Sequence, residues 1–102
     1  MTNTKQFIYV IKPITTFLKE ENWTEVEEDI INRHFNYLVN LKEKGKIILA
    51  GKTNGLDNKT FGIVIIETET EEEAMTIMNN DPAILEGIMT AEFYPYRVAI
   101  MR

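Results

Sequence analysis

Runs of apolar residues separated by short polar stretches predict four strands along this chain. The segment Gln6–Lys12 is aromatic and β-branched, which is typical of a buried strand, and Pro13 ends it. Ile47–Gly51 and Gly62–Thr68 predict two more strands of the same kind. Alternating apolar side chains in Ala91–Met101 predict a fourth strand, which closes the chain.

A longer period between the first two strands predicts a helix. Thr24 and Glu27 form a capping-box pattern at its start, and the helix is expected to run to about Lys44 and to stop at Gly45. Steps of three and four residues place one stripe of side chains on a single helical face. That stripe comprises Val26, Ile30, His34, Leu38 and Leu41.

Two further helical segments follow the third strand. A second capping-box pattern, Thr70–Glu73, opens a helix that is expected to end near Asn79. Asp81 then precedes Pro82, the usual order of an N-cap and a first helical position. Gly87 is suited to ending this short turn.

The resulting order is β-α-β-β-α-β, which predicts one α+β, ferredoxin-like domain over residues 1–102. Such a fold has a four-stranded antiparallel sheet with both helices on one face. The strands are apolar on both faces, so the helix-free face needs a cover. We therefore expect two copies of the chain to pair sheet to sheet as a homodimer.

Composition and charge limit the partners. The chain has 102 residues, 44% of them hydrophobic, and a formal net charge of −5, which disfavours nucleic acid as a partner. No apolar run is long enough for a membrane span, and cysteine is absent, so we expect a cytoplasmic protein that does not bind membranes. Five lysines in mid-chain form either a solvated rim or an attraction for a small anion: Lys42, Lys44, Lys46, Lys52 and Lys59.

His34 is the only histidine and the first candidate for proton transfer. An imidazole has an ordinary pKa of about 6.5, and the helical stripe aims this one at the interior. A buried, hydrogen-bonded core histidine is the commoner alternative. The absence of serine and cysteine excludes Ser–His–Asp and Cys–His mechanisms within the chain. With one nitrogen ligand and no nucleotide-binding glycine motif, we expect neither a metal nor a cofactor.

Asp81 is the best candidate to orient the His34 ring, because it lies where the chain changes direction. Capping the following helical turn would by itself explain this aspartate. Arg97 could anchor a substrate carboxylate or phenolate, or it could be an exposed cross-strand partner. The full set of candidate substrate-binding residues is Tyr9, Trp23, Tyr37 and Arg97.

Several short motifs, taken in order, resemble the YciI-like (YCII-related) family. They are the run from His34 to Leu41, Gly45-Lys46, Ala50-Gly51, Asn80-Asp81-Pro82 with Gly87, and Phe93-Tyr94-Pro95-Tyr96. The resemblance implies a dimeric α/β barrel built from two ferredoxin-like chains, with a His–Asp site at His34 and Asp81. One branch of the family is associated with dehydrochlorination of a chlorinated hydroxyquinol. The polar insert Ile14–Trp23 and the acid-rich helix start depart from the family pattern.

Two main functions remain open from the sequence. The first is a cofactor-independent lyase or hydrolase that acts on a small organic substrate, aromatic or acidic, with His34 as the base and Asp81 as its partner. The second is a dimer that binds such a molecule without transforming it. A purely structural dimer would have no cavity near His34. Cofactorless monooxygenases and haem-degrading proteins share the general barrel shape, but a shared fold does not carry function.

Overall fold

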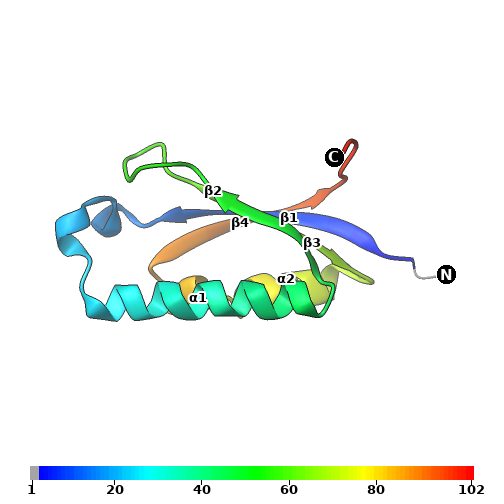
Figure 1. Ribbon diagram of the computed structural model, residues 1–102, viewed down its shortest axis with the longest axis horizontal. Helices are drawn as coiled ribbons and strands as arrows, with labels where there is room; N and C mark the ends of the chain where they lie inside the picture. Colours follow the sequence, from blue (N-terminus) through cyan, green and yellow to red (C-terminus); the bar gives the residue numbers. More distant parts are fainter. Residues whose placement is uncertain (1–2) are drawn as a thin grey trace.

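The computed structural model describes residues 3–102 and shows helices packed on one face of a four-stranded antiparallel sheet (Figure 1). The predicted order of elements is confirmed, and the strand order in the sheet is β2-β3-β1-β4. The strands are β1 (Lys5–Pro13), β2 (Ile47–Lys52), β3 (Gly62–Thr68) and β4 (Met89–Tyr96). The helices are α1 (Glu25–Glu43), α2 (Glu71–Asn79) and the single turn α3 (Pro82–Leu85). Among residues 3–102, no helix is long and apolar enough to cross a membrane.

Local sequence signals fix both ends of α1. Thr24 is its N-cap, and the Glu27 carboxylate accepts the Thr24 backbone N–H at 2.8 Å, which completes the predicted capping box. At the other end Gly45 has a φ of +73°, a left-handed conformation that suits glycine. The Lys46 N–H then donates to the Leu41 carbonyl at 2.8 Å, the bond that closes a Schellman motif.

The second predicted capping box forms only in part. The Thr70 hydroxyl accepts the Glu73 N–H at 3.1 Å, as expected of an N-cap. The Glu73 carboxylate makes an ion pair at 2.8 Å with Lys46. A tertiary partner from the connection between α1 and β2 therefore occupies the group that the local motif would have used.

The main core lies between the sheet and the helices. Tyr9, Val64 and Ile66 on the inner face of the sheet are 1% exposed or less. The predicted α1 stripe is confirmed at Ile30 and Leu41, which are both buried. It is wrong at Val26, whose side chain is 64% exposed, because the first turn of α1 extends beyond the core elements that cover Ile30.

Strand β4 ends at Tyr96, five residues before the end that the sequence predicted at Met101. It pairs with β1, and its register runs from Met89 opposite Pro13 to Tyr96 opposite Gln6. Because β1 begins at Lys5, the chain after Tyr96 has almost no partner left to pair with. Arg97 therefore follows the strand and does not belong to it, a correction to the predicted Ala91–Met101 strand.

The polar insert after β1 forms two short 3-10 turns, Thr15–Leu18 and Glu20–Asn22. The Trp23 indole N–H donates to the Phe17 carbonyl at 2.9 Å, and the two rings lie 5.5 Å apart between centroids. The insert thus holds Trp23 in a fixed position beside the start of α1.

Candidate active site

Helix α1 presents His34 toward the interior, with its side chain 13% exposed. Ring nitrogen Nδ1 lies 2.6 Å from carboxylate oxygen Oδ1 of Asp81, which is 47 positions away in the sequence. Among residues 3–102, Nε2 has no hydrogen-bond partner, and it is not sealed from solvent. An Nδ1–H donating to the carboxylate leaves the lone pair on Nε2 free to accept a proton.

Asp81 is fully buried and is held by hydrogen bonds from three different groups. Its Oδ1 accepts the Ala83 backbone N–H at 3.0 Å, so it is the N-cap of α3 as predicted. The same oxygen also faces His34, and Oδ2 accepts the Tyr9 hydroxyl at 2.8 Å. Capping and ring orientation are therefore compatible, because Oδ1 contacts both the Ala83 N–H and the His34 ring while Oδ2 accepts the Tyr9 hydroxyl.

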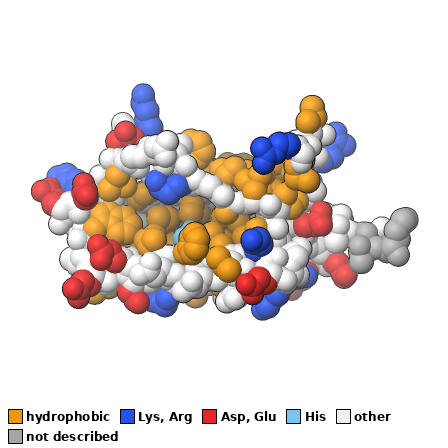
Figure 2. Space-filling view, viewed as in Figure 1, with side chains coloured by type: hydrophobic (Ala, Val, Ile, Leu, Met, Phe, Trp, Pro, Cys, Tyr) orange, Lys and Arg blue, Asp and Glu red, His pale blue; other side chains and the backbone are white. Residues whose placement is uncertain are grey.

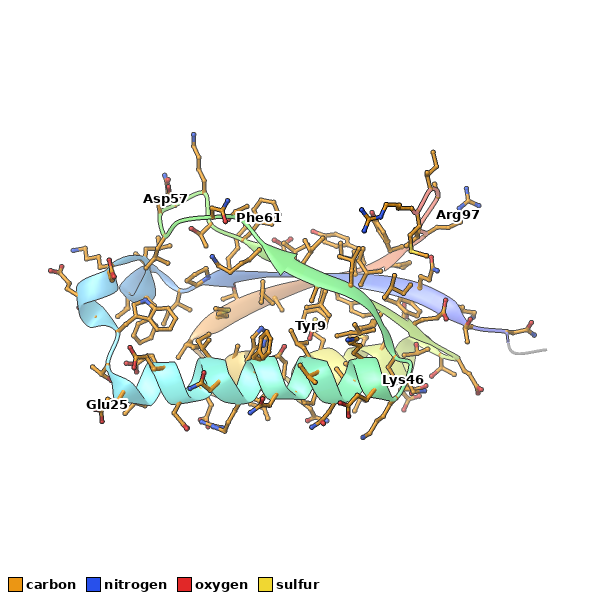
Figure 3. All side chains as sticks on the ribbon, viewed as in Figure 1. Tyr9, Glu25, Lys46, Asp57, Phe61 and Arg97 are labelled. Atoms are coloured by element: carbon orange, nitrogen blue, oxygen red, sulfur yellow. The ribbon has the colours of Figure 1, made fainter. Side chains whose placement is uncertain are left out.

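Tyr9 extends from strand β1 into the layer between the sheet and α1 (Figure 3), where its hydroxyl meets Asp81. Its side chain is completely buried. Burial, together with the adjacent Asp81 carboxylate, raises the pKa of Tyr9 well above its usual value of about 10. The hydroxyl therefore stays protonated at neutral pH and remains a donor to Asp81.

A cavity of about 400 Å³ opens beside His34, between α1 and strands β1, β2 and β3. Its volume falls within the range of small-molecule sites. Figure 2 shows the histidine, in pale blue, surrounded by hydrophobic side chains on this face of the molecule. The residues that line the cavity are Ile11, Trp23, Ile31, His34, Phe35, Leu38, Ala50, Gly51, Lys52, Gly62, Ile63 and Val64.

Glycine at position 62 makes room for this cavity. In the sheet, Gly62 pairs with Ile11 on one side and with Lys52 on the other, so the three residues form a row across the strands. A Cβ at Gly62 would lie 3.1 Å from Ile11 Cγ1 and 3.2 Å from the Gly51 carbonyl oxygen. Any larger residue would crowd this row and fill the space beside it.

The structure brings His34 and Asp81 together and places Trp23 in the cavity wall. Tyr9, Tyr37 and Arg97 do not line the cavity. Tyr9 donates its hydroxyl to Asp81, and Tyr37 donates its hydroxyl to the Ile77 carbonyl of α2 at 2.7 Å. Arg97 follows β4 at the end of the sheet far from the 3-10 turns (Figure 3).

The pKa of Tyr37 is raised for the same two reasons as that of Tyr9. Burial, the larger cause, and the negative charge of Asp81, the smaller, raise the pKa of Tyr37 to about 12. Both tyrosines are thus neutral near pH 7. The buried Asp81 carboxylate is the common source of negative potential under the site.

Phe35 and Lys52 are cavity residues that the sequence reasoning did not assign to a binding role. Phe35 follows His34 on α1 and is 64% exposed, so it is an aromatic ring at the open side of the cavity. Lys52 was noted only as one of five mid-chain lysines. The alternation of β2, with Ala50 opposite the buried Val64, would have placed Lys52 on the helix-facing side if the register had been known.

The chain is similar to known proteins in both sequence and fold. A family model described as the YCII-related domain matches residues 6–95. A search of curated proteins found no match. Among solved structures, the chain is similar to 5-chloro-2-hydroxyhydroquinone dehydrochlorinase from Burkholderia phenoliruptrix, solved in complex with 2,5-dihydroxybenzoquinone. The two share 26% identity with a TM-score of 0.68, over 90% of this chain and 93% of that one.

Proposed function

Because the family match covers residues 6–95, the chain belongs to the YCII-related domain family, and on that premise we propose that it is a small-molecule lyase. His34 acts as the general base and Asp81 as the group that orients it. The observation that carries the proposal is the 2.6 Å contact between His34 Nδ1 and the buried Asp81 carboxylate at the wall of a cavity. A fixed Nδ1–H leaves Nε2 as the proton acceptor.

The proposed reaction is removal of H–X from a small organic molecule. Where X is bound to a hydroxylated ring, the substrate reacts as its keto tautomer, in which one hydroxyl proton has moved to the carbon that carries X. His34 Nε2 accepts the proton of a second hydroxyl, whose oxygen forms a C=O bond while the neighbouring ring double bond shifts to the carbon that carries X. The leaving group X departs with the electron pair of its own bond to carbon. The imidazolium, stabilised by Asp81, then releases its proton to X or to water, so the step balances without an oxidant or reductant.

The structural neighbour supports a substrate with a hydroxylated ring. That protein is a dehydrochlorinase whose structure holds 2,5-dihydroxybenzoquinone. The aromatic rings of Trp23 and Phe35 and the apolar wall of the present cavity suit a molecule of this size and flatness. We therefore propose a halogenated or otherwise substituted hydroxyhydroquinone as the first substrate class to test.

The test is a turnover assay with 5-chloro-2-hydroxyhydroquinone, measuring chloride release and quinone absorbance together. His34→Asn is expected to lower kcat/KM by about 10²–10⁴-fold, the usual contribution of a positioned base. Asn40→Ala, at an exposed position on the same helix, is the matched control and should leave turnover unchanged. Unchanged turnover in His34→Asn would contradict the proposal, and ligand binding without turnover in the native protein would favour a binding module.

We further propose that two copies of the chain pair through the helix-free face of the sheet. Leu49, Tyr94 and Tyr96 lie on that face and are between 43% and 46% exposed. In Figure 1 the β2–β3 connection and the C-terminal segment both rise on this side, and Ile100 in that segment is 93% exposed. An exposed apolar sheet face of this kind is typical of an interface.

Light scattering after size-exclusion chromatography tests the pairing. One copy has a mass of 11.9 kDa, and the native protein is expected to have twice that mass. Leu49→Lys, on strand β2 of the exposed face, is expected to shift it toward one copy, whereas Val26→Lys is a control at an exposed apolar residue of α1. A single-copy mass for the native chain would overturn this proposal.

A further inference from the structure

Lys52 is the one cationic side chain that lines the cavity within the part of the chain that the structure describes. It stands at the end of β2, in the same row as Gly62 and on the side of the sheet that faces α1. The rest of the wall is apolar apart from His34. Lys52 itself is exposed to solvent, so its charge lies at the mouth of the cavity, where an anion whose apolar part contacts the wall can pair with it and where salt screens the pair.

The ammonium group of Lys52 has N–H groups that can donate to a ligand. Its Nζ donates to the Thr53 carbonyl oxygen at 2.7 Å, which uses one of three N–H groups. Within residues 3–102 no carboxylate lies within ion-pair distance of Lys52, although Lys46 has such a partner. The charge of Lys52 is therefore not matched by the fold, in a protein whose net charge is −5.

We propose that Lys52 makes this cavity selective for small organic anions, whose phenolate or carboxylate oxygen pairs with the lysine ammonium beside His34. The inference rests on the proposed function and deepens it, because it names the charge of the substrate. An oxygen paired with Lys52 leaves the rest of the molecule against the apolar wall and within reach of the imidazole. A phenolate held in this way also carries the electron density that expels a leaving group.

Lys52 has an alternative role that makes a different prediction. β2 is an edge strand, and an inward-pointing charge discourages a further strand from adding to such an edge. If that is its role, a lysine is needed at this position, but the affinity of the cavity for a ligand does not depend on the charge of the ligand. The two explanations can therefore be separated with ligands of one shape and three charges.

The experiment is an NMR titration with benzoate, benzamide and benzamidinium, which carry charges of −1, 0 and +1 on nearly the same frame. The indole signal of Trp23, the only tryptophan, and the amide signal of Gly62 report on the cavity wall. The native protein is expected to bind benzoate about tenfold more tightly than benzamide, and benzamidinium more weakly still. The preference is expected to shrink as salt is raised.

Three variants locate the effect. Lys52→Met is expected to abolish the preference for benzoate, and Lys52→Arg, which keeps the charge, to restore it. Lys59→Met changes the net charge by the same amount at an exposed lysine outside the cavity, and it should leave the preference intact. An equal loss in Lys59→Met would show a general charge effect and overturn the assignment to Lys52.

The remaining outcomes separate this inference from the proposed function. Equal affinities for the three ligands in the native protein would overturn the role of Lys52 while leaving the cavity as a binding site. Binding of none of them at the cavity signals would contradict both proposals. A preference for benzoate that persists in a chain whose turnover is insensitive to His34→Asn would uphold the anion site and remove the lyase assignment.

Discussion

Removing the Tyr9 hydroxyl should destabilise the protein far more than removing an exposed hydroxyl with a similar partner. Tyr9 donates to Asp81 Oδ2 at 2.8 Å, with both side chains completely buried. In Tyr9→Phe this oxygen loses its donor at a site that lies away from water. A hydrogen bond to a charged group contributes about 1.5–3 kcal/mol, and we expect a loss of unfolding free energy of that size.

Tyr94 provides the matched control. Its hydroxyl donates to the Glu92 carboxylate at 2.7 Å, and in a single copy the pair is exposed, so water can replace the lost bond. Because Tyr94 lies on the face proposed to pair, both variants are compared in the Leu49→Lys background, which is expected to be a single copy. Tyr94→Phe is therefore expected to change the unfolding free energy by less than about 0.5 kcal/mol. The two variants lose the same atom and the same kind of bond, so burial is the main difference between them.

Urea unfolding and thermal unfolding, followed by circular dichroism, measure both variants. For a domain of this size each kcal/mol corresponds to about 4–8 °C in Tm, so Tyr9→Phe should melt roughly 6–24 °C lower than Leu49→Lys alone. The m-value should not change, because the surface exposed on unfolding is the same. Equal losses in Tyr9→Phe and Tyr94→Phe would refute the claim that Asp81 depends on a buried donor.

Three further predictions test the surroundings of the site. Since the folded-state pKa values of Tyr9 and Tyr37 are raised, the unfolding free energy should be unaffected by these groups below pH 10 and should fall as the pH rises above it. In alkaline unfolding curves, Tyr9→Phe should reduce the dependence of the unfolding free energy on pH by about 1.4 kcal/mol per pH unit. Gly62→Ala should destabilise the protein by about 1–3 kcal/mol and weaken ligand binding, whereas Gly51→Ala, with open space at its Cβ, should leave stability within about 0.5 kcal/mol in urea titrations. Thr24→Ala should cost about 0.5–2 kcal/mol in the same assay, because the cap of α1 is lost.

The features that the sequence predicted well are encoded by neighbouring residues. The α1 cap at Thr24, its end at Gly45 and the N-cap at Asp81 each depend on contacts within a few positions. The order of strands and helices follows from hydrophobic periods of the same local kind. These signals were sufficient for the fold, and the family match agrees with them.

The features that could not be predicted from the sequence depend on contacts between residues far apart in it. Tyr9 and Asp81 are 72 positions apart, so no local pattern shows that the tyrosine donates a hydrogen bond to the aspartate. Glu73 fits a capping box but pairs with Lys46, a partner supplied by the connection between α1 and β2. The exposure of Val26 follows from where the core ends and not from its place on the helical stripe.

The most direct test of the central claim is the tautomer of His34, read from the imidazole ¹⁵N signals by NMR at a pH where the ring is neutral. With one histidine in the chain, the two nitrogen signals need no assignment against others. We predict a protonated Nδ1 and an unprotonated Nε2 in the native protein, and a loss of that preference in Asp81→Asn. A neutral ring protonated at Nε2 in the native protein, or a pattern unchanged in Asp81→Asn, would contradict the account.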